Sequence, residues 1–572
     1  MSTPSTASWP VSSAWCCSAP AFSSAGDEAL IVNATSANAP RGGMNRMSRR
    51  VMNLAHFVTQ NARRHGARPG FIWGDKSWNW REIDGHVSAL AAALAARGIV
   101  KGDRILVHSK NGDEMFWSMF AAFRLGAVWV PTNFRLMPDE VAYLATASGA
   151  KAFLCHGDFS DHAAAVSGPE FTWRIGEGAF GETSLTEAIK AHAGVDFENV
   201  AVDYDDPCWF FFTSGTTGRS KAAVLTHGQM AFVVTNHLAD LTPGTTERDA
   251  SLVVAPLSHG AGVHQLMQTA RGVPTILLPS EKFDIAEAFR LIELHRISNI
   301  FTVPTILKMM VEHPAADRFD HSSLRYVIYA GAPMYREDQK AALQKLGGVL
   351  VQYFGLGEVT GNITVLPAEL HDPDDGPQAR IGSCGYERTG MQVSIQGDDG
   401  RELKPFETGE ICVIGPAVFA GYYDNPEANA KAFRDGWFRT GDLGHMDEEG
   451  FVYITGRASD MYISGGSNIY PREVEEKILT HPGIGEVAVL GIPDPVWGEV
   501  GVAVCVPREG ASVTEAEMAG FLSPKVPRYK MPKRFFFWDA LPKSGYGKIP
   551  KRLVRDELEA RGLLDVTATK KD

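Results

Sequence analysis

Helix-like and strand-like patterns of apolar residues alternate along the chain from about residue 52 onward. Residues 80–98 contain an alanine- and leucine-rich run that ends at Gly98, which predicts an amphipathic helix. Residues 104–107 follow a turn and form a short apolar run, which predicts a buried strand. Because this alternation continues through residue 200, we expect parallel sheets with helices on their faces.

Further apolar runs end at glycines or at small polar residues. They predict strands at residues 208–212, 222–225, 252–257, 300–305, 324–329 and 349–353. In α/β proteins, ligands bind beyond the carboxyl ends of such strands. We therefore look for the site in the residues that follow them, including His259 and the Gly331-Ala332 pair.

The last third of the chain predicts smaller structural units than the part before it. Residues 381–385 and 408–411 predict a smaller β subdomain, and Pro471 stands where it would open a helix. Strands are then expected at residues 487–491, 502–506 and 534–538. The predicted fold class is α/β, with a large N-terminal domain of flanked parallel sheets plus a β subdomain, followed by a small α+β C-terminal domain.

Length and charge narrow the class of protein. A chain of 572 residues is too long for one ordinary core, so at least two domains are expected. The formal net charge of −12 argues against a nucleic-acid binder. The seven cysteines form no CxxC pair, which favours free thiols in a reducing compartment. The most apolar stretch, residues 115–131, carries Arg124, so no membrane-spanning segment is expected and a cytoplasmic location is favoured.

Residues 1–50 are rich in serine and alanine, with four arginines near their end. We expect this extension to be disordered. A transit peptide and a start codon assigned too early are the alternatives. In the latter case Met44, Met47 or Met52 would begin the protein.

The most informative stretch is residues 213–221, Thr-Ser-Gly-Thr-Thr-Gly-Arg-Ser-Lys, which lies between two predicted strands. Glycines let backbone N–H groups approach phosphate oxygens, hydroxyls donate further hydrogen bonds, and Lys221 adds a positive charge. The spacing differs from a Walker A loop. Taken alone, the stretch is a candidate phosphate loop, and a simple polar surface loop is the alternative.

Three other side chains have chemistry that suits a nucleotide site. Glu358 follows a glycine turn after a predicted strand, where a carboxylate can hold Mg²⁺, and a surface glutamate is the alternative. Asp442 lies between Gly441 and Leu443, where it can accept ribose hydroxyls or simply form a β-turn. His259 lies among glycines at a strand end, and a solvated turn histidine is the alternative.

Together these motifs resemble the adenylate-forming enzymes: acyl-CoA synthetases, firefly-luciferase-like enzymes and peptide-synthetase adenylation domains. The resemblance rests on residues 213–221, 256–259, 353–358, 436–444, 456–461 and 541–549, in the family's order. The family pattern also has proline and glycine where this chain has Ser220 and Ala222. Phe354 replaces a tyrosine, and Gly357 replaces a threonine that usually hydrogen-bonds the α-phosphate. Thr360 is a candidate substitute for that missing hydroxyl.

The resemblance implies a role for each matching residue. The implied nucleotide-binding residues are Thr213, Ser214, Gly215, Thr216, Thr217, Gly218, Lys221, Gly331, Ala332, Tyr353, Phe354, Gly355, Asp442 and Arg457. The implied catalytic residues are Lys548, which bridges the attacking carboxylate and the α-phosphate, Glu358, which holds Mg²⁺, and His259, a gate and pocket wall.

The same resemblance implies a moving C-terminal domain. Asp460 is the implied hinge, so the N-terminal AMP-binding domain is placed at residues 51–459 and the small mobile domain at 460–572. Gly465 and Gly466 are implied to line the tunnel for the pantetheine of coenzyme A.

These features predict an ATP-dependent acyl-CoA synthetase that uses Mg²⁺ and coenzyme A. Its expected substrate is a small carboxylic acid, either a medium-chain fatty acid or an aromatic acid, and a second copy of the chain is a candidate partner in a homodimer. The main alternative is an enzyme that loads the acyl group onto a carrier protein. An amino-acid substrate is disfavoured because residues 256–259 lack an aspartate, and a luciferase-like enzyme because no peroxisomal tripeptide ends the sequence. A non-catalytic nucleotide-binding protein is the remaining alternative.

Overall fold

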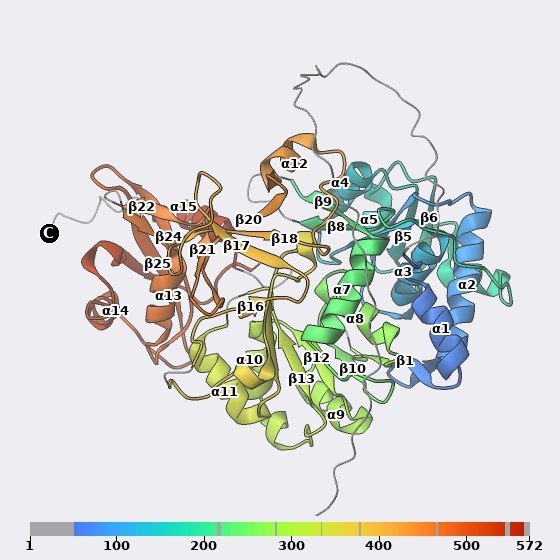
Figure 1. The fold of residues 1–572 in the computed structure, drawn as a ribbon, viewed down its shortest axis with the longest axis horizontal. Helices are drawn as coiled ribbons and strands as arrows, with labels where there is room; N and C mark the ends of the chain where they lie inside the picture. The colour runs from blue at the N-terminus through green and yellow to red at the C-terminus, as the bar shows by residue number, and fades with distance from the viewer. Residues whose placement is uncertain are drawn as a thin grey trace, which may run out of the picture. The chain divides into compact units, whose positions relative to one another are not determined.

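The computed structural model describes most of the chain, and all the described residues belong to the compact unit Arg49–Asp572. The described ranges are 51–213, 219–280, 283–332, 334–376, 379–464, 467–543 and 549–564 (Figure 1). The extension 1–50, for which the sequence predicts disorder, lies outside these ranges.

A seven-stranded sheet forms the first half of the large domain, in the order β7-β6-β5-β3-β4-β8-β9. Its strands are β3 (Arg104–His108), β4 (Val128–Thr132), β5 (Ala152–His156), β6 (Phe171–Ile175), β7 (Thr183–Ser184), β8 (Pro207–Thr213) and β9 (Lys221–Thr226). Every neighbouring pair is parallel except β8 and β9, which form an antiparallel hairpin.

A nine-stranded sheet forms the second half, in the order β16-β15-β14-β13-β12-β10-β11-β1-β2. Its strands are β1 (Pro69–Trp73), β2 (Lys76–Asn79), β10 (Ser251–Val253), β11 (Thr275–Leu277), β12 (Asn299–Thr302), β13 (Tyr326–Tyr329), β14 (Leu350–Phe354), β15 (Thr364–Leu366) and β16 (Tyr386–Glu387). The central pairs are parallel and both edges are antiparallel, so the predicted α/β class is confirmed.

Helices connect and cover the two sheets (Figure 1). They are α1 (His56–His65), α2 (Trp80–Ala96), α3 (Asp113–Leu125), α4 (Pro138–Ser148), α5 (Ser160–Ala165), α6 (Leu185–Ala191), α7 (His227–Asp240), α8 (Gly260–Ala270), α9 (Ile285–His295), α10 (Pro304–Glu312) and α11 (Arg336–Leu346). Short 3₁₀ turns occur at η1 (Pro314–Asp317), η2 (Gly357–Val359) and η3 (Ala368–Leu370).

Successive side chains along each strand point to opposite faces of the sheet and so enter different hydrophobic clusters. In β3, Ile105 and Val107 belong to one hydrophobic cluster and Leu106 to another, as expected when successive side chains point to opposite faces. The first cluster also contains Val253 and Ile328 of the nine-stranded sheet, so it is a common core between the two sheets. Both faces are therefore buried, which explains the nearly continuous apolar runs of these strands.

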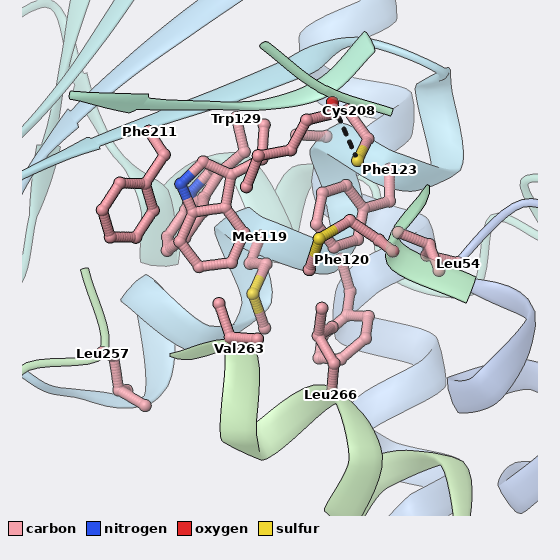
Figure 2. Packing of buried hydrophobic residues seen from close by; sticks show 14 of the residues in the cluster. Leu54, Met119, Phe120, Phe123, Trp129, Cys208, Phe211, Leu257, Val263 and Leu266 are labelled. Atoms are coloured by element: carbon pink, nitrogen blue, oxygen red, sulfur yellow. Dashed lines mark hydrogen bonds between the residues drawn. The ribbon is translucent and has the colours of Figure 1, made fainter. Parts of the chain in front are cut away.

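Aromatic rings dominate that common core. Trp129 and Trp209 meet edge to face, with ring centroids 4.6 Å apart. Phe120 and Phe123 of α3 belong to the same cluster (Figure 2), and the ring centroid of Phe211 in β8 lies 6.1 Å from that of Trp209. Such contacts hold β8, and hence the start of the candidate phosphate loop, against the centre of the domain.

The rest of the chain forms two smaller sheets. The β subdomain contains β17 (Gln392–Gln396), β18 (Gly409–Ile414), β19 (Phe433–Arg434), β20 (Trp437–Met446) and β21 (Val452–Arg457), with α12 (Pro426–Ala432) beside it. The last sheet contains β22 (Tyr462–Ser464), β23 (Ser467–Ile469), β24 (Ile484–Asp494), β25 (Gly498–Pro507) and β26 (Arg534–Phe537). Its helices are α13 (Pro471–Leu479), α14 (Glu515–Leu522) and α15 (Lys551–Ala560), and the 3₁₀ turn η4 spans Arg528–Lys530.

Hydrophobic clusters near the end of the chain contain only residues from 462 onward, while the clusters of the earlier sheets end at residue 454. The last sheet therefore has its own core. The predicted boundary between residues 459 and 460 stays a prediction.

Two predicted strands are shorter in the structure. The sequence predicts an extended segment over residues 252–257, but β10 ends at Val253. The backbone beyond it bonds to a side chain instead of a neighbouring strand: Leu257 N–H donates to Asn111 Oδ1 (2.8 Å), and Asn111 Nδ2 donates to the Ala255 carbonyl (3.0 Å). Likewise β12 ends at Thr302, because Pro304 opens α10.

Two further observations concern the whole described chain. Within it, no helix has both the length and the apolar character required to cross a bilayer. The described cysteines are all free, buried thiols: Cys155, Cys208, Cys384, Cys412 and Cys505.

Candidate active site

A buried carboxylate lies where the seven-stranded sheet, the nine-stranded sheet and the β subdomain meet. Glu358 of η2 is 5% exposed. Its Oε1 accepts hydrogen bonds from the Thr213 hydroxyl (2.8 Å) and from the Tyr422 hydroxyl (2.9 Å). Thr213 is the last residue of β8, so this contact ties the predicted metal-binding glutamate to the start of the predicted phosphate loop.

Tyr422 reaches Glu358 because the segment after β18 pairs with β9. Val224 N–H donates to the Gly421 carbonyl (3.0 Å), and Tyr423 N–H donates to the Ala222 carbonyl (2.9 Å). Burial and the negative charge of Glu358 raise the pKa of the Tyr422 phenol, so it stays a neutral donor at physiological pH. The Lys221 amine lies 5.2 Å from the centroid of the same ring.

Asp442 and Arg457 form an ion pair next to this centre. They face each other across the antiparallel pair β20 and β21, and Arg457 Nε lies 2.9 Å from Asp442 Oδ1. Asp442 is buried, while the Arg457 side chain is 42% exposed. The positive charge of Arg457 also acts on the pKa of Tyr422, in the downward direction, so the pair and the Glu358 cluster share one electrostatic environment.

His259 lies at the N-cap of α8, beside the strand that leads into the phosphate loop. Its Nδ1 accepts the Gly260 N–H at 2.8 Å. The imidazole meets the ring of Phe211 in β8 edge to face, with centroids 4.6 Å apart and an interplanar angle of 73°. The histidine is thus part of a defined packing arrangement.

The end of β14 brings Tyr353 and Phe354 to the same edge of the nine-stranded sheet. Tyr353 stacks on Phe301 with centroids 6.0 Å apart. A side chain at Gly355 is excluded, because its Cβ would lie 2.4 Å from Cα of Gly361. Two backbone segments therefore touch just before and just after Glu358, which fixes its turn.

Gly331 and Ala332 follow β13 at the same edge, and Gly331 has a φ of +82°, a conformation that glycine adopts without strain.

Asp460 lies between β21 and β22, where its N–H donates to the Arg457 carbonyl (3.0 Å) and its carboxylate accepts from the Ser459 hydroxyl (3.4 Å). The predicted role of Asp460 as a hinge concerns a movement between two conformations of the protein, so it stays a prediction.

Several predicted residues lie outside the described ranges: Ser214, Gly215, Thr216, Thr217, Gly218, Gly465, Gly466 and Lys548. Their neighbours are described. Thr213 and Lys221 pair across the β8–β9 hairpin, and Ser464 pairs with Ser467 across β22 and β23.

The missing threonine at position 357 has a physical explanation. A Cβ on Gly357 would lie 2.6 Å from Cδ1 and Cε1 of Phe211 and 2.9 Å from Cγ2 of Thr213. Those two residues of β8 already fill the space that a side chain would need. Thr360 is buried and its hydroxyl donates to the Val359 carbonyl (2.7 Å), so its suggested replacement role stays a prediction.

The donors present fit Mg²⁺ bound together with a polyphosphate. Glu358 supplies a carboxylate and Thr213 a hydroxyl, both hard oxygen donors. Among the described residues no group of three or more metal-binding side chains occurs. Mg²⁺ usually takes one or two carboxylates and completes its shell with phosphates and water, and Glu358 provides one carboxylate.

Sequence reasoning missed Tyr422 and Phe211 as parts of this site. Tyr422 lies in the run Gly421-Tyr422-Tyr423, but only the pairing with β9 shows which of the two tyrosines faces Glu358. For Phe211 the sequence predicts only a place in a buried strand. The related signal in the sequence is Gly357, since Phe211 occupies the space that a side chain at this position would need.

Comparison with known proteins identifies the family of the chain. The AMP-binding enzyme family matches residues 58–423, and its C-terminal domain, the AMP-binding enzyme C-terminal domain, matches residues 473–548. The chain therefore belongs to the AMP-binding enzyme family.

Individual relatives cover nearly the whole chain. A feruloyl-CoA synthase from Amycolatopsis sp is 35% identical over 508 residues, covering 88% of this chain and 99% of that protein. The indoleacetate–CoA ligase of Aromatoleum aromaticum is 33% identical over 532 residues, covering 90% and 100%. The crystal structure of ATP-bound MatB from Rhodopseudomonas palustris superposes with a TM-score of 0.79 at 29% identity, covering 89% of this chain and 99% of that one.

Proposed function

We propose that this protein is an AMP-forming acid–thiol ligase that activates a carboxylic acid with ATP and transfers the acyl group to coenzyme A. The observation that carries the proposal is the convergence of Thr213, Tyr422 and Glu358 with the Asp442–Arg457 pair. Hydroxyl donors, a buried carboxylate and an ion pair of that kind suit the phosphates, the metal and the ribose of one nucleotide.

In the first step, a carboxylate oxygen of the acid attacks the α-phosphate of ATP, and pyrophosphate leaves. Thr213 and Lys221 bind the phosphates at the start and end of the loop, and Asp442 and Arg457 bind the ribose. Glu358 would hold Mg²⁺, which would supply positive charge to offset that of the phosphates. Lys548 stabilises the negative charge that develops between the two reacting anions. No base is required, because carboxylic acids are already ionised at neutral pH.

In the second step, the thiol of coenzyme A attacks the acyl carbonyl and AMP leaves. The C-terminal domain turns about Asp460, which removes Lys548 from the site and brings Gly465 and Gly466 to the pantetheine tunnel. One site thus serves both steps through a conformational change.

The acid is proposed to be aromatic or a medium-chain fatty acid. Two relatives are named for aromatic acids, a feruloyl-CoA synthase and an indoleacetate–CoA ligase. His259 is proposed to form a wall of the acid site, where the Phe211 ring lies beside it and the side chains of Phe301 and Tyr353 lie beside its neighbour Gly260. The enzyme is further proposed to act in the cytoplasm, with a homodimer as a candidate assembly.

A pyrophosphate-release assay tests the proposal. The purified protein is incubated with Mg·ATP and a panel of acids, including benzoate, cinnamate, ferulate, hexanoate and decanoate, with and without coenzyme A. We expect pyrophosphate release and a thioester with at least one acid, detected by mass spectrometry. The Lys548→Ala variant should reduce adenylation by a factor of about 100 or more, since electrostatic stabilisation of that kind contributes factors of this size.

The matched control is Lys543→Ala, in the same segment, where the native amine contacts Glu486 on the protein surface. It should retain wild-type rates. Adenylation without any thioester would favour the carrier-protein alternative. No pyrophosphate release with any acid, or normal adenylation by Lys548→Ala, would overturn the proposal.

A further inference from the structure

Phe211 and Gly357 fit each other closely at the junction of the two sheets. Gly357 begins η2, and the backbone there has no left-handed φ that would demand glycine. Phe211 and Thr213 exclude a side chain at this position, because a Cβ added there would lie 2.6 Å from two carbons of the Phe211 ring. Steric space, rather than backbone strain, therefore links Phe211 and Gly357.

The Phe211 ring also touches His259. The two rings meet edge to face with centroids 4.6 Å apart, and Phe211 is only 5% exposed. The ring centroid of Trp209, on the same strand, lies 6.1 Å away. Leu257, two residues before His259, belongs to the same hydrophobic cluster as Phe211 (Figure 2). The ring is thus held between the turn of Glu358 and the N-cap of α8.

A ring in this position has little freedom to move. The Trp209 ring lies on one side of it and the His259 ring on another, so a side chain added at Gly357 would press the Phe211 ring against these neighbours. The imidazole is itself attached to the first turn of α8 through the Gly260 N–H. A change in size at position 357 would therefore be transmitted through Phe211 to His259.

We infer that Phe211 is a positioning residue for the acid: through its close contact with Gly357, it sets the place of His259 and with it the size of acid that the enzyme accepts. This inference rests on the proposed function, in which His259 forms a wall of the acid site. Phe211 and Gly357 then complement each other in size: the large side chain on β8 occupies the space left by the glycine in η2.

The test is a double-mutant cycle with Gly357→Ala, Phe211→Leu and the combined variant. Gly357→Ala adds one methyl group against the ring, and Phe211→Leu removes the ring while keeping an apolar side chain. For each protein, kcat and KM are measured for benzoate, cinnamate, hexanoate and decanoate and for ATP, using pyrophosphate release. Thermal unfolding is recorded in parallel, so that loss of folding is recognised.

The control is Gly348→Ala. No atom lies within 4 Å of the position that a Cβ would take at Gly348, and the φ of this residue is also outside the left-handed region. This variant should keep wild-type kinetics for every acid.

We expect Gly357→Ala to reduce kcat/KM for the best acid about tenfold in the wild-type background and no more than about threefold in the Phe211→Leu background, a coupling typical of residues in contact. The rescue is partial because Thr213 Cγ2 also lies 2.9 Å from the added methyl. Phe211→Leu should change the ratio of kcat/KM between decanoate and benzoate at least about fivefold, while KM for ATP stays within about twofold.

Two outcomes would overturn the inference. The first is an equal effect of Gly357→Ala in both backgrounds. The second is a uniform loss of activity for all acids with an unchanged selectivity ratio, which would mean a purely structural role. Failure of the proposed function is separate, because the wild-type protein would then release no pyrophosphate with any acid.

Discussion

Glu358 shows how a single residue acquires its role from partners distant in sequence. Its position after a strand and a glycine turn makes it a metal candidate from sequence alone. The two hydroxyl donors, Thr213 and Tyr422, come from 145 residues before and 64 residues after it. Local patterns cannot specify such contacts, because they depend on which strands become neighbours. The sequence therefore predicts Glu358, and Thr213 as a nucleotide-binding residue, but neither of the two hydrogen bonds to Glu358.

Tyr422→Phe tests this contact. The substitution removes one hydrogen bond to a buried carboxylate and keeps the ring. Because hydrogen bonds to charged groups contribute roughly 1.5–3 kcal/mol, we expect the adenylation rate to fall at least about tenfold. Pyrophosphate release at several Mg²⁺ concentrations measures the effect.

Tyr423→Phe is the control for that substitution, since the neighbouring tyrosine packs on Phe210 through its ring (centroids 4.7 Å apart). It should leave the rate unchanged. Equal rates for Tyr422→Phe and wild type would show that the hydroxyl does not serve the reaction.

At the scale of elements, α7 is joined to the turn of Glu358 by a buried arginine. Arg388 Nε donates to Asp240 Oδ2 at the end of α7 (3.3 Å), and Nη1 donates to the Gly361 carbonyl (3.5 Å). Burial lowers the pKa of Arg388 to about 10, and the charge of Asp240 acts in the opposite direction. The helix, the turn and the segment after β16 are thereby fixed to one another.

Arg388→Met should destabilise the protein strongly. The Arg388 side chain is fully buried and that of Asp240 is 10% exposed, so the substitution leaves a buried carboxylate without its cation. Loss of one partner of a buried pair costs about 3–5 kcal/mol in free energy of unfolding. Urea unfolding followed by tryptophan fluorescence measures the change.

The comparison variant is Arg401→Met, whose native arginine pairs with Asp399 while 87% exposed. Its expected effect is below about 1 kcal/mol, as for most surface ion pairs. A small effect of Arg388→Met, similar to that of Arg401→Met, would contradict the structural role given to the buried arginine.

Element boundaries also show where sequence reasoning reached its limit. Threonine is a preferred N-cap residue, and α7 begins at His227 with the Gln229 N–H bonded to the Thr226 hydroxyl (3.2 Å). Capping is a local effect, so the sequence specifies it. The early end of β10 depends on Asn111, which lies far earlier in the chain, and no local pattern reports that partner.

At the scale of the whole molecule, several histidines are buried as neutral rings. Burial lowers the pKa of His108 and His264 to about 3 and that of His227 and His371 to about 4. In the unfolded chain these groups take up protons near pH 6.5, whereas in the folded state they do so only below about pH 4. Between those values the unfolded state binds more protons, so acidification destabilises the fold.

We therefore expect the free energy of unfolding to fall steadily from about pH 6.5 to about pH 5. Each such histidine contributes up to about 1.4 kcal/mol per pH unit in this window. Urea unfolding at about pH 7, 6 and 5 gives the slope, and His264→Gln should reduce it. A stability that stays constant or rises as the pH falls would contradict the neutral, buried state of these rings.

The architecture was predictable at this scale for a clear reason. Alternating apolar helices and strands require parallel sheets with covered faces, whatever their detailed packing. The order of strands within each sheet was beyond the sequence, because β1 and β2, early in the chain, complete the edge of the second sheet beside β11. That arrangement depends on long-range packing.

The contact between Gly355 and Gly361 bears on how the enzyme could be redesigned. Any side chain at position 355 would force two backbones apart, and the same crowding surrounds Gly361, whose added Cβ would meet the Tyr353 ring at 2.4 Å. A combinatorial library aimed at new acids should therefore leave both glycines constant and vary Phe211 of β8 together with Gly357, because these two residues share one space.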